Sequence, residues 1–127
     1  MAFVSTFEGI HNLRKAALFI YLVHLERTYD IRDGLSSFEV AELLGISKGD
    51  ASNLLSKNQG FHLLKRTTLG GKAGQSRKAN YYYLAGDGWK WYLRWFDSLP
   101  LQRWGITAEW LAGLDAKLAG LLAKRGF

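Results

Sequence analysis

The chain of 127 residues has a net charge of +6 at pH 7 and no cysteine, which excludes disulfides and thiolate metal sites. Its hydrophobic content of 48% excludes a disordered chain and suffices for one domain with a core and one appended element. The longest apolar run, residues 16–23, is far shorter than the roughly 20 residues of a membrane helix, and residues 1–9 lack a signal-peptide pattern. We therefore expect a cytoplasmic protein.

The positive charge is concentrated in the middle of the chain. Residues 47–80 contain seven lysines and arginines against one aspartate, a surplus that equals the net charge of the whole chain. A localised basic region favours a polyanionic partner such as nucleic acid. A solvated basic surface without a partner is the alternative interpretation.

A long helix is predicted from Ser5 to about Tyr29. Ser5 and Glu8 have the spacing of a capping box, which satisfies free backbone N–H groups at a helix start. The middle of this helix is apolar on nearly all sides, which predicts burial against two neighbours. Arg14 and Lys15 lie near its start, where they either reach a phosphate or are ordinary surface charges. An Asp-Gly step makes residues 28–35 a loop.

Two short helices joined by a tight turn are predicted between residues 36 and 60. Ser36 and Glu39 form a capping box for the first, and Gly45 ends it because glycine readily adopts left-handed backbone angles. Ser47 caps the second, with Asp50 in the box position. The spacing of apolar residues assigns the buried faces to Phe38, Ala41, Leu43 and Leu44 in the first helix and to Ala51, Leu54 and Leu55 in the second.

The opposite face of the second short helix is small and polar. It carries Gly49, Ser52, Asn53 and Ser56, flanked by Lys48, Asp50 and Lys57. A face of this kind can approach another surface closely, and the edges of base pairs are one such surface.

A β-hairpin follows this helix pair. Residues 61–69 and 81–84 are predicted strands, and residues 70–80 contain three glycines, polar residues and three cations, typical of a hairpin tip. The two strands with their basic tip form a projecting wing. For Tyr81, Tyr82 and Tyr83 we favour packing in the sheet over stacking on bases.

The C-terminal part contains two further predicted helices, separated by a break at Pro100. Residues 87–98 form the first, and the second runs from a cap at Thr107 to about Arg125, with Gly126 as its stop. Its apolar stripe predicts a dimerisation element, with folding back onto its own protomer as the alternative. The stripe consists of Leu111, Leu114, Leu118, Leu121 and Leu122, beside a stripe of alanines at 112, 116, 119 and 123.

This order of elements resembles the winged helix-turn-helix domain of the MarR, ArsR and PadR groups of prokaryotic regulators. The resemblance covers about residues 10–96 and is carried by Glu39-Val40-Ala41, Leu44-Gly45-Ile46-Ser47, the strand entry at residues 62–66, and Tyr82-x-Leu84-Ala85-x-x-Gly88. Two positions depart from it. His62 stands where glycine is usual, and Ala85 replaces a capping hydroxyl for which Asp87 is a possible substitute.

The resemblance implies a mainly α fold with a small β-hairpin wing, divided into a DNA-binding domain at residues 1–98 and a linker with a dimerisation helix at 99–127. It implies a dimeric regulator of double-stranded DNA whose second short helix lies in the major groove. Asn53 would read adenine, and Asp50 would either accept from cytosine or cap its helix, which we favour. The implied DNA-binding residues are Lys48, Gly49, Ser52, Asn53, Ser56, Lys57, Arg66, Lys72, Gln75, Arg77 and Lys78.

Other functional classes have less support in the sequence. The three histidines lack metal-ligand spacing with carboxylates, and no phosphate loop or nucleophile elbow occurs, so we expect no enzyme, no metal and no cofactor. A winged-helix protein-interaction module, or a DNA-binding protein of chromatin, plasmid partition or viral replication, remains open. The five tryptophans are interpreted as core in preference to the pocket of a flat apolar effector.

Overall fold

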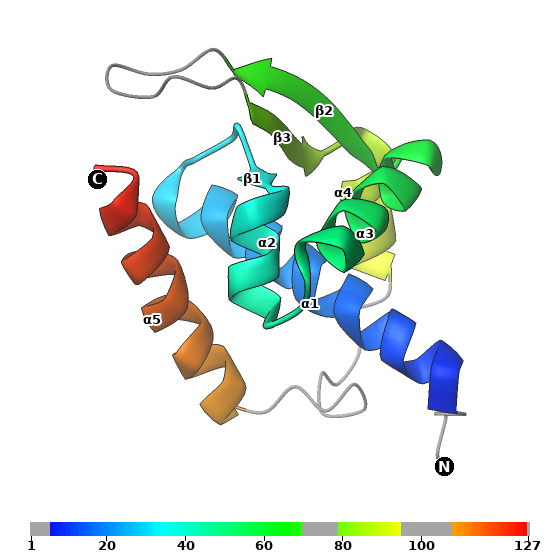
Figure 1. Ribbon diagram of the computed structural model, residues 1–127, viewed down its shortest axis with the longest axis horizontal. Coiled ribbons are helices and arrows are strands. Elements are labelled where there is room, and N and C mark those ends of the chain that lie inside the picture. Colours follow the sequence, from blue (N-terminus) through cyan, green and yellow to red (C-terminus); the bar gives the residue numbers. More distant parts are fainter. Residues whose placement is uncertain (1–5, 70–78, 95–107, 127) are drawn as a thin grey trace.

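The computed structural model describes residues 6–69, 79–94 and 108–126 (Figure 1). Five helices and three strands occur in these ranges. In chain order they are α1 (Thr6–Tyr29), β1 (Leu35–Ser36), α2 (Ser37–Leu44), α3 (Lys48–Gly60), β2 (Leu64–Leu69), β3 (Ala79–Leu84), α4 (Gly86–Tyr92) and α5 (Ala108–Lys124). The predicted class, mainly helical with a small β-hairpin, is therefore confirmed.

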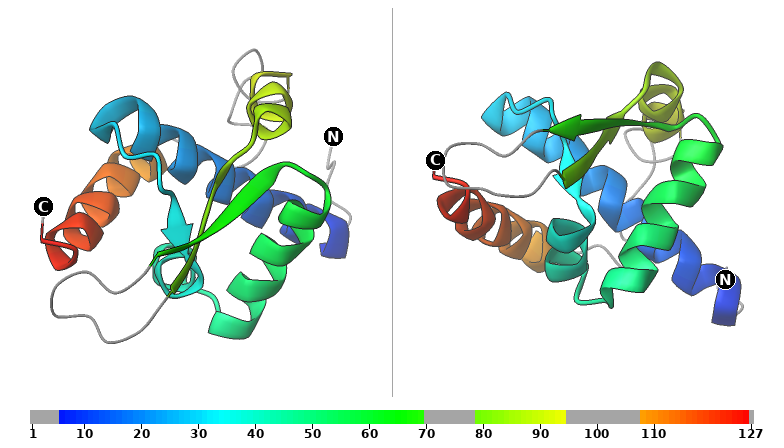
Figure 2. Two further views of the ribbon diagram at one scale, coloured as in Figure 1. Left: turned by 90° about the horizontal axis from the view of Figure 1, so that it is seen from above. Right: turned by 45° about the horizontal axis from the view of Figure 1, so that its top comes forward.

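The middle of α1 forms the centre of the core. Leu18, Phe19, Tyr21 and Leu25 are each at most 2% exposed, and Figure 1 shows α1 crossing the molecule behind α2 and α3. In both Figure 1 and Figure 2, α2 lies between α5 on one side and α3 on the other. This arrangement gives α1 neighbours on more than one side and confirms the burial that its apolar surface predicts.

The two short helices have the ends that the sequence predicts. The Ser36 hydroxyl accepts a hydrogen bond from the Glu39 N–H, and the Ser36 N–H donates to the Glu39 carboxylate at 2.9 Å, which completes the capping box. Gly45 ends α2 with a φ of 66°, and the Ser47 hydroxyl accepts from the Asp50 N–H at 3.0 Å. These local bonds satisfy donors that a helix start otherwise leaves unpaired.

The sheet has the strand order β1-β3-β2 and is antiparallel throughout. β2 and β3 are the predicted hairpin, with Arg66 opposite Tyr82 and Leu64 opposite Leu84. The two-residue strand β1 was not predicted, because it lies at the end of a segment interpreted as a loop. It pairs with β3 immediately after Gly34, whose φ is 82° and where an added Cβ would lie 1.8 Å from the Tyr82 carbonyl oxygen. Only glycine fits this position without a backbone shift.

The helix after the wing begins without a side-chain cap. Ala85 occupies the N-cap position of α4, and no side chain makes a capping bond there, so Asp87, the possible substitute, does not cap this helix. The glycine at position 88 of the wing-exit motif has a steric reason, because an added Cβ there would lie 2.1 Å from the Leu63 carbonyl oxygen. Trp91 packs on Phe19 with ring centroids 4.8 Å apart, as a core tryptophan would. The remainder of the predicted helix, residues 95–98, lies outside the described residues.

The C-terminal helix α5 packs on its own protomer. Leu114, Leu118, Leu121 and Leu122 are at most 4% exposed and belong to the same hydrophobic cluster as α1. In the single chain these four leucines are therefore covered by their own protomer, the alternative to a dimerisation role that the sequence left open. Of the five, only Leu111 is exposed, at 38%. Helix α5 and helix α1 therefore share a core.

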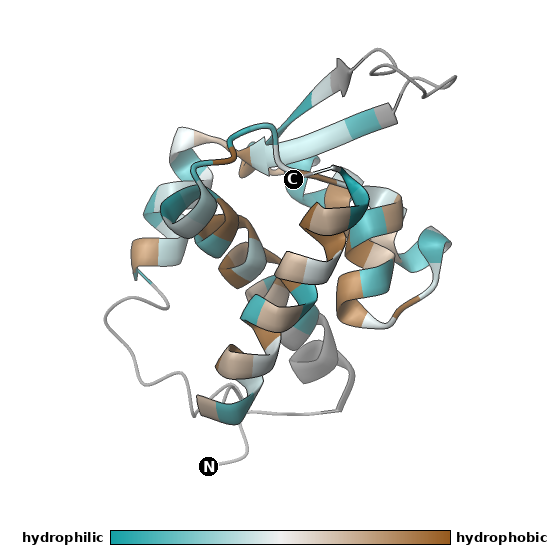
Figure 3. Ribbon diagram, turned by 90° about the vertical axis from the view of Figure 1, so that its left-hand side faces the viewer, coloured by the Kyte–Doolittle hydropathy of each residue, from teal (hydrophilic) through white to brown (hydrophobic). Residues whose placement is uncertain are grey.

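The outward face of α5 is composed of small residues. Ala112, Ala116, Ala119 and Ala123 are all exposed, and an added Cβ at Gly113 or Gly120 would meet nothing within 4 Å. Figure 3 views the molecule from the side of α5 and shows apolar residues along the helix interrupted by hydrophilic ones. This face is open in the single chain.

Candidate nucleic-acid interface

Helix α3 is fixed to the core by one face only. Ala51 and Leu55 are fully buried, and Asn58, 2% exposed, donates from its side chain to the Leu54 carbonyl at 2.8 Å. Both views of Figure 2 show α3 at the surface of the molecule. A helix held in this way presents its opposite face to solvent in a fixed orientation.

The predicted DNA-binding residues of α3 lie together on that outer face. Gly49, Asn53 and Ser56 are exposed, Lys48 and Lys57 flank them and are also exposed, and Ser52 is half-buried at the edge. The arrangement combines hydrogen-bonding groups with two cations and leaves room for close approach at Gly49. Such a surface can pair with base edges and phosphates.

Lys48 is held over an aromatic ring that was expected in the core. The Lys48 ammonium lies 3.8 Å from the centroid of the Phe38 ring, and Phe38 is 64% exposed. The prediction that Phe38 is buried is wrong, because Val40 and Leu43 form the inward face of α2. The ring restricts a flexible cation through a cation–π contact, so Phe38 positions Lys48 beside the outer face of α3.

Of the DNA-binding residues predicted for the wing, one lies within the described residues. Arg66 is exposed on β2, which begins four residues after α3 ends, and Lys65 beside it is exposed as well. Lys72, Gln75, Arg77 and Lys78 lie outside the described residues.

On the flank of α3 that faces α1, Arg14, Asp50 and Lys57 surround an open cavity of about 120 Å³, which Asn53 and Leu54 also line. The Arg14 guanidinium lies 3.4 Å from the Asp50 carboxylate. The Asp50 side chain therefore pairs with α1, and only its backbone N–H takes part in the cap, contrary to the role we favoured. Arg14, from a different helix, therefore lies beside the outer face of α3.

Lys15, the next residue of α1, lies among aromatic rings. Its ammonium is 4.2 Å from the centroid of Trp91, 5.7 Å from that of Phe61 and 5.9 Å from that of Phe19. Burial lowers the pKa of Lys15, and the nearby charge of Lys57 lowers this pKa further. The two lysines are therefore close enough to repel each other, which concentrates positive charge beside α3.

The end of α3 shows how the chain accommodates a departure from the winged-helix pattern. The helix ends at Gly60, and His62 adopts a φ of 62°. This left-handed conformation is one that glycine takes without strain, and His62 stands where the resembling regulators have glycine.

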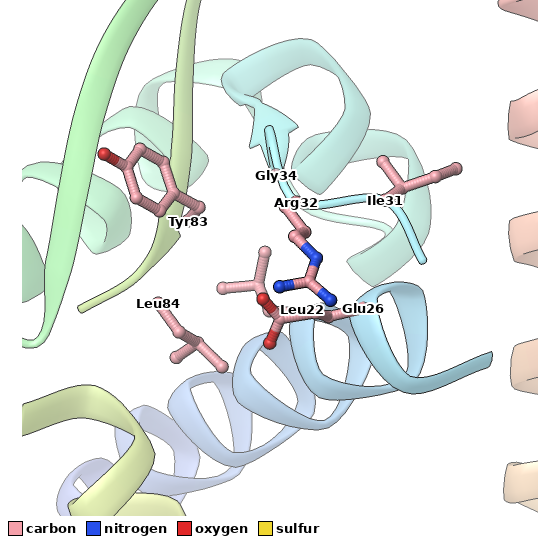
Figure 4. A pocket seen from close by; sticks show the side chains of 7 residues that line it. All are labelled: Leu22, Glu26, Ile31, Arg32, Gly34, Tyr83 and Leu84. Atoms are coloured by element: carbon pink, nitrogen blue, oxygen red, sulfur yellow. The ribbon is translucent and has the colours of Figure 1, made fainter. Parts of the chain in front are cut away.

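No metal site was found in the part of the chain that the structure describes. It contains no group of three His, Asp or Glu side chains placed to hold a metal ion, and no described helix is long and apolar enough to span a membrane. A second cavity, beneath Arg32 between α1, the segment before β1 and β3, has a volume of about 10 Å³ (Figure 4). That volume suits about one water molecule.

Comparison with known proteins identifies the fold. No protein-family model matches the sequence, and a search of curated proteins found no relative. A MepR mutant from a multidrug-resistant Staphylococcus aureus clinical isolate aligns with a TM-score of 0.56 and 18% identity over 92% of this chain and 84% of that chain. The S. aureus MepR–DNA complex aligns with a TM-score of 0.50 and 22% identity, over 96% and 80% of the two chains. These likenesses establish the fold: the chain is built as the winged helix-turn-helix of MepR, a MarR-family regulator.

Proposed function

We propose that this protein is a homodimeric transcriptional regulator that binds double-stranded DNA by sequence. The observation that carries the proposal is the outer face of α3, where exposed polar groups and two lysines stand on a helix whose other face is fully buried. The fold supports it, since one of the similar MepR structures is a complex with DNA. A protein with this function acts in the cytoplasm and is associated with the nucleoid when bound.

The residues divide by chemistry into those that read bases and those that bind phosphates. With α3 in the major groove, the Asn53 carboxamide pairs bidentately with adenine, and Ser52 and Ser56 bond to bases or phosphates. Lys48, Lys57 and Arg66 bind phosphates and fix the register without reading sequence. The wing residues Lys72, Gln75, Arg77 and Lys78 follow the backbone or enter the minor groove.

Selection of bound duplexes from a random DNA pool, followed by affinity measurements on the selected site, tests this function. Asn53→Ala should cost about 1–3 kcal/mol on the selected site and little on random DNA. Gln59→Ala is the matched control, because it removes a carboxamide from the half-buried flank of the same helix. Unchanged sequence preference in Asn53→Ala contradicts the assignment of the reading face, and absence of salt-dependent duplex binding contradicts the function.

The proposed dimer uses the outward face of α5. That face offers Leu111 and the exposed alanines, which permit close approach of a second helix. Light scattering of Ala116→Glu, with Lys117→Glu as the control on the flank of the same helix, tests the interface. We expect the first variant to be monomeric and the second dimeric, and a monomeric wild-type protein contradicts the dimer.

A further inference from the structure

We propose that Arg14 and Lys57 form a seat for a DNA backbone phosphate beside the reading face of α3, and that Asp50 holds Arg14 there in the free protein and weakens its contact with DNA. This proposal rests on the proposed function. It adds a residue of α1 to the interface and assigns Asp50 a role in limiting affinity.

The geometry of the cavity suits a phosphate. One flank of α3 carries Asp50, Asn53 and Lys57 in succession, and Arg14 borders the cavity from the side of α1. Its volume of about 120 Å³ is several times the roughly 10–15 Å³ that one water requires. A phosphate bound there would lie next to Asn53 and would fix the register of the reading face.

The charges at this cavity are unbalanced. The cavity region contains three cations, Arg14, Lys57 and the adjacent Lys15, and one carboxylate, that of Asp50. These groups together have a net charge of +2. Among the carboxylates whose side chains the structure describes, none forms an ion pair with Lys57 or Lys15. The lowered pKa of Lys15 reflects this crowding, after the larger effect of its own burial. A polyanion would relieve the repulsion between the cations.

The Arg14–Asp50 pair is built to exchange partners. It consists of one contact at 3.4 Å between side chains that are 35% and 52% exposed. A guanidinium has five donors in a planar fork that matches a phosphate bidentately, so this single long contact leaves most of its capacity unused. An incoming phosphate offers Arg14 a better partner and at the same time repels the Asp50 carboxylate.

The experiment measures affinity for a selected and a random duplex over a salt series in the full-length protein. Arg14→Gln should weaken binding to both duplexes and lower the salt slope by about 1. Asp50→Asn should strengthen binding to both by about three- to tenfold, because it removes a repelled charge and releases Arg14. Asp30→Asn is the matched control, since Asp30 pairs with Arg32 at 3.0 Å on an exposed loop and carries the same charge.

The double variant separates release of Arg14 from a general charge effect. If Arg14 fills the seat, Arg14→Gln should remove at least half of the gain from Asp50→Asn, measured as the ratio of dissociation constants. Arg14→Lys should keep the salt slope and weaken binding, because it keeps the charge and loses the fork. The phosphate seat is overturned if Asp50→Asn increases affinity equally with and without Arg14→Gln, or if Arg14→Gln leaves the salt slope unchanged. In either case, duplex binding by the wild type still supports the proposed function. Absence of duplex binding by the wild type contradicts both.

Discussion

Two arginine–carboxylate pairs join distant segments of this chain, and their surroundings differ sharply. Arg125, just after α5, donates to both oxygens of Glu39 at 2.5 Å and to the Gly34 carbonyl at 2.7 Å. Arg125 and Glu39 side chains are 9% and 14% exposed. Arg14 makes one contact of 3.4 Å with Asp50, and both of those side chains are more than a third exposed, at 35% and 52%.

The difference separates a group that holds the fold from one that remains available to a partner. Burial alone would lower the pKa of Arg125, but the hydrogen bonds and charge of Glu39 raise the pKa above its ordinary value, so the guanidinium stays charged. Glu39 also completes the capping box of α2, so Arg125 attaches the end of α5 to the start of the helix-turn-helix. Arg14 has no comparable set of bonds, so its guanidinium can exchange Asp50 for another anion.

The largest effect is expected for the buried pair. Arg125→Ala should lower the free energy of unfolding by about 2–4 kcal/mol, because it leaves the largely buried Glu39 carboxylate and the Gly34 carbonyl without their donor. Urea denaturation measures this change. Lys124→Ala is a suitable control, since Lys124 pairs with Glu42 at the surface of the same turn. A loss of stability no greater than that of the control would remove the distinction between the two regions.

Substitution of a solvent-exposed cation in the proposed interface should weaken DNA binding and leave stability unchanged, in contrast to Arg125→Ala. Arg66→Ala should weaken binding to selected and random duplexes alike, with a salt slope lower by about 1, and should leave the unfolding free energy nearly unchanged. Anisotropy titrations at several salt concentrations measure the slope, with Lys90→Ala on α4 as an exposed cation outside the proposed site. Equal effects of the two variants would place Arg66 outside the interface.

The exposed pair should contribute little to stability. Arg14→Ala should lower the unfolding free energy by about 0.2–1 kcal/mol, since its partly exposed ion pair is screened by solvent. The same denaturation experiment measures it. A loss as large as that of Arg125→Ala would mean that Arg14 is a structural residue and not one poised for a partner.

A third link, between α1 and α5, should be lost at low pH. Asp115 accepts hydrogen bonds from His24 at 3.0 Å and from Tyr29 at 2.7 Å, and these bonds lower the pKa of Asp115 below its ordinary 3.8. Because the folded state favours the carboxylate, this contribution is present above pH 3.8 and is lost as the pH falls further. The difference in the free energy of unfolding between wild type and Asp115→Asn should therefore be smaller below this pH than at pH 6. If this difference in unfolding free energy does not change with pH, the Asp115 carboxylate does not make the stabilising contribution assigned to it.

The local structure of the helix-turn-helix could be predicted because it depends on residues three or four positions apart. Ser36 with Glu39, Gly45, and Ser47 with the Asp50 N–H determine where α2 and α3 begin or end, and the same short spacing separates buried Ala51 and Leu55 from exposed Asn53. The polar outer face of α3 was thus determined by the sequence alone.

The tertiary structure decided everything that depends on which surfaces meet. The leucine stripe of α5 indicated a buried face, but periodicity does not distinguish a partner subunit from the same chain, and the protomer covers it. Arg125 and Glu39 are separated by 86 residues, and Arg14 and Asp50 by 36, so only folding brings each pair together. Whether an arginine is locked or available follows from the burial around it, which is a property of the assembled structure.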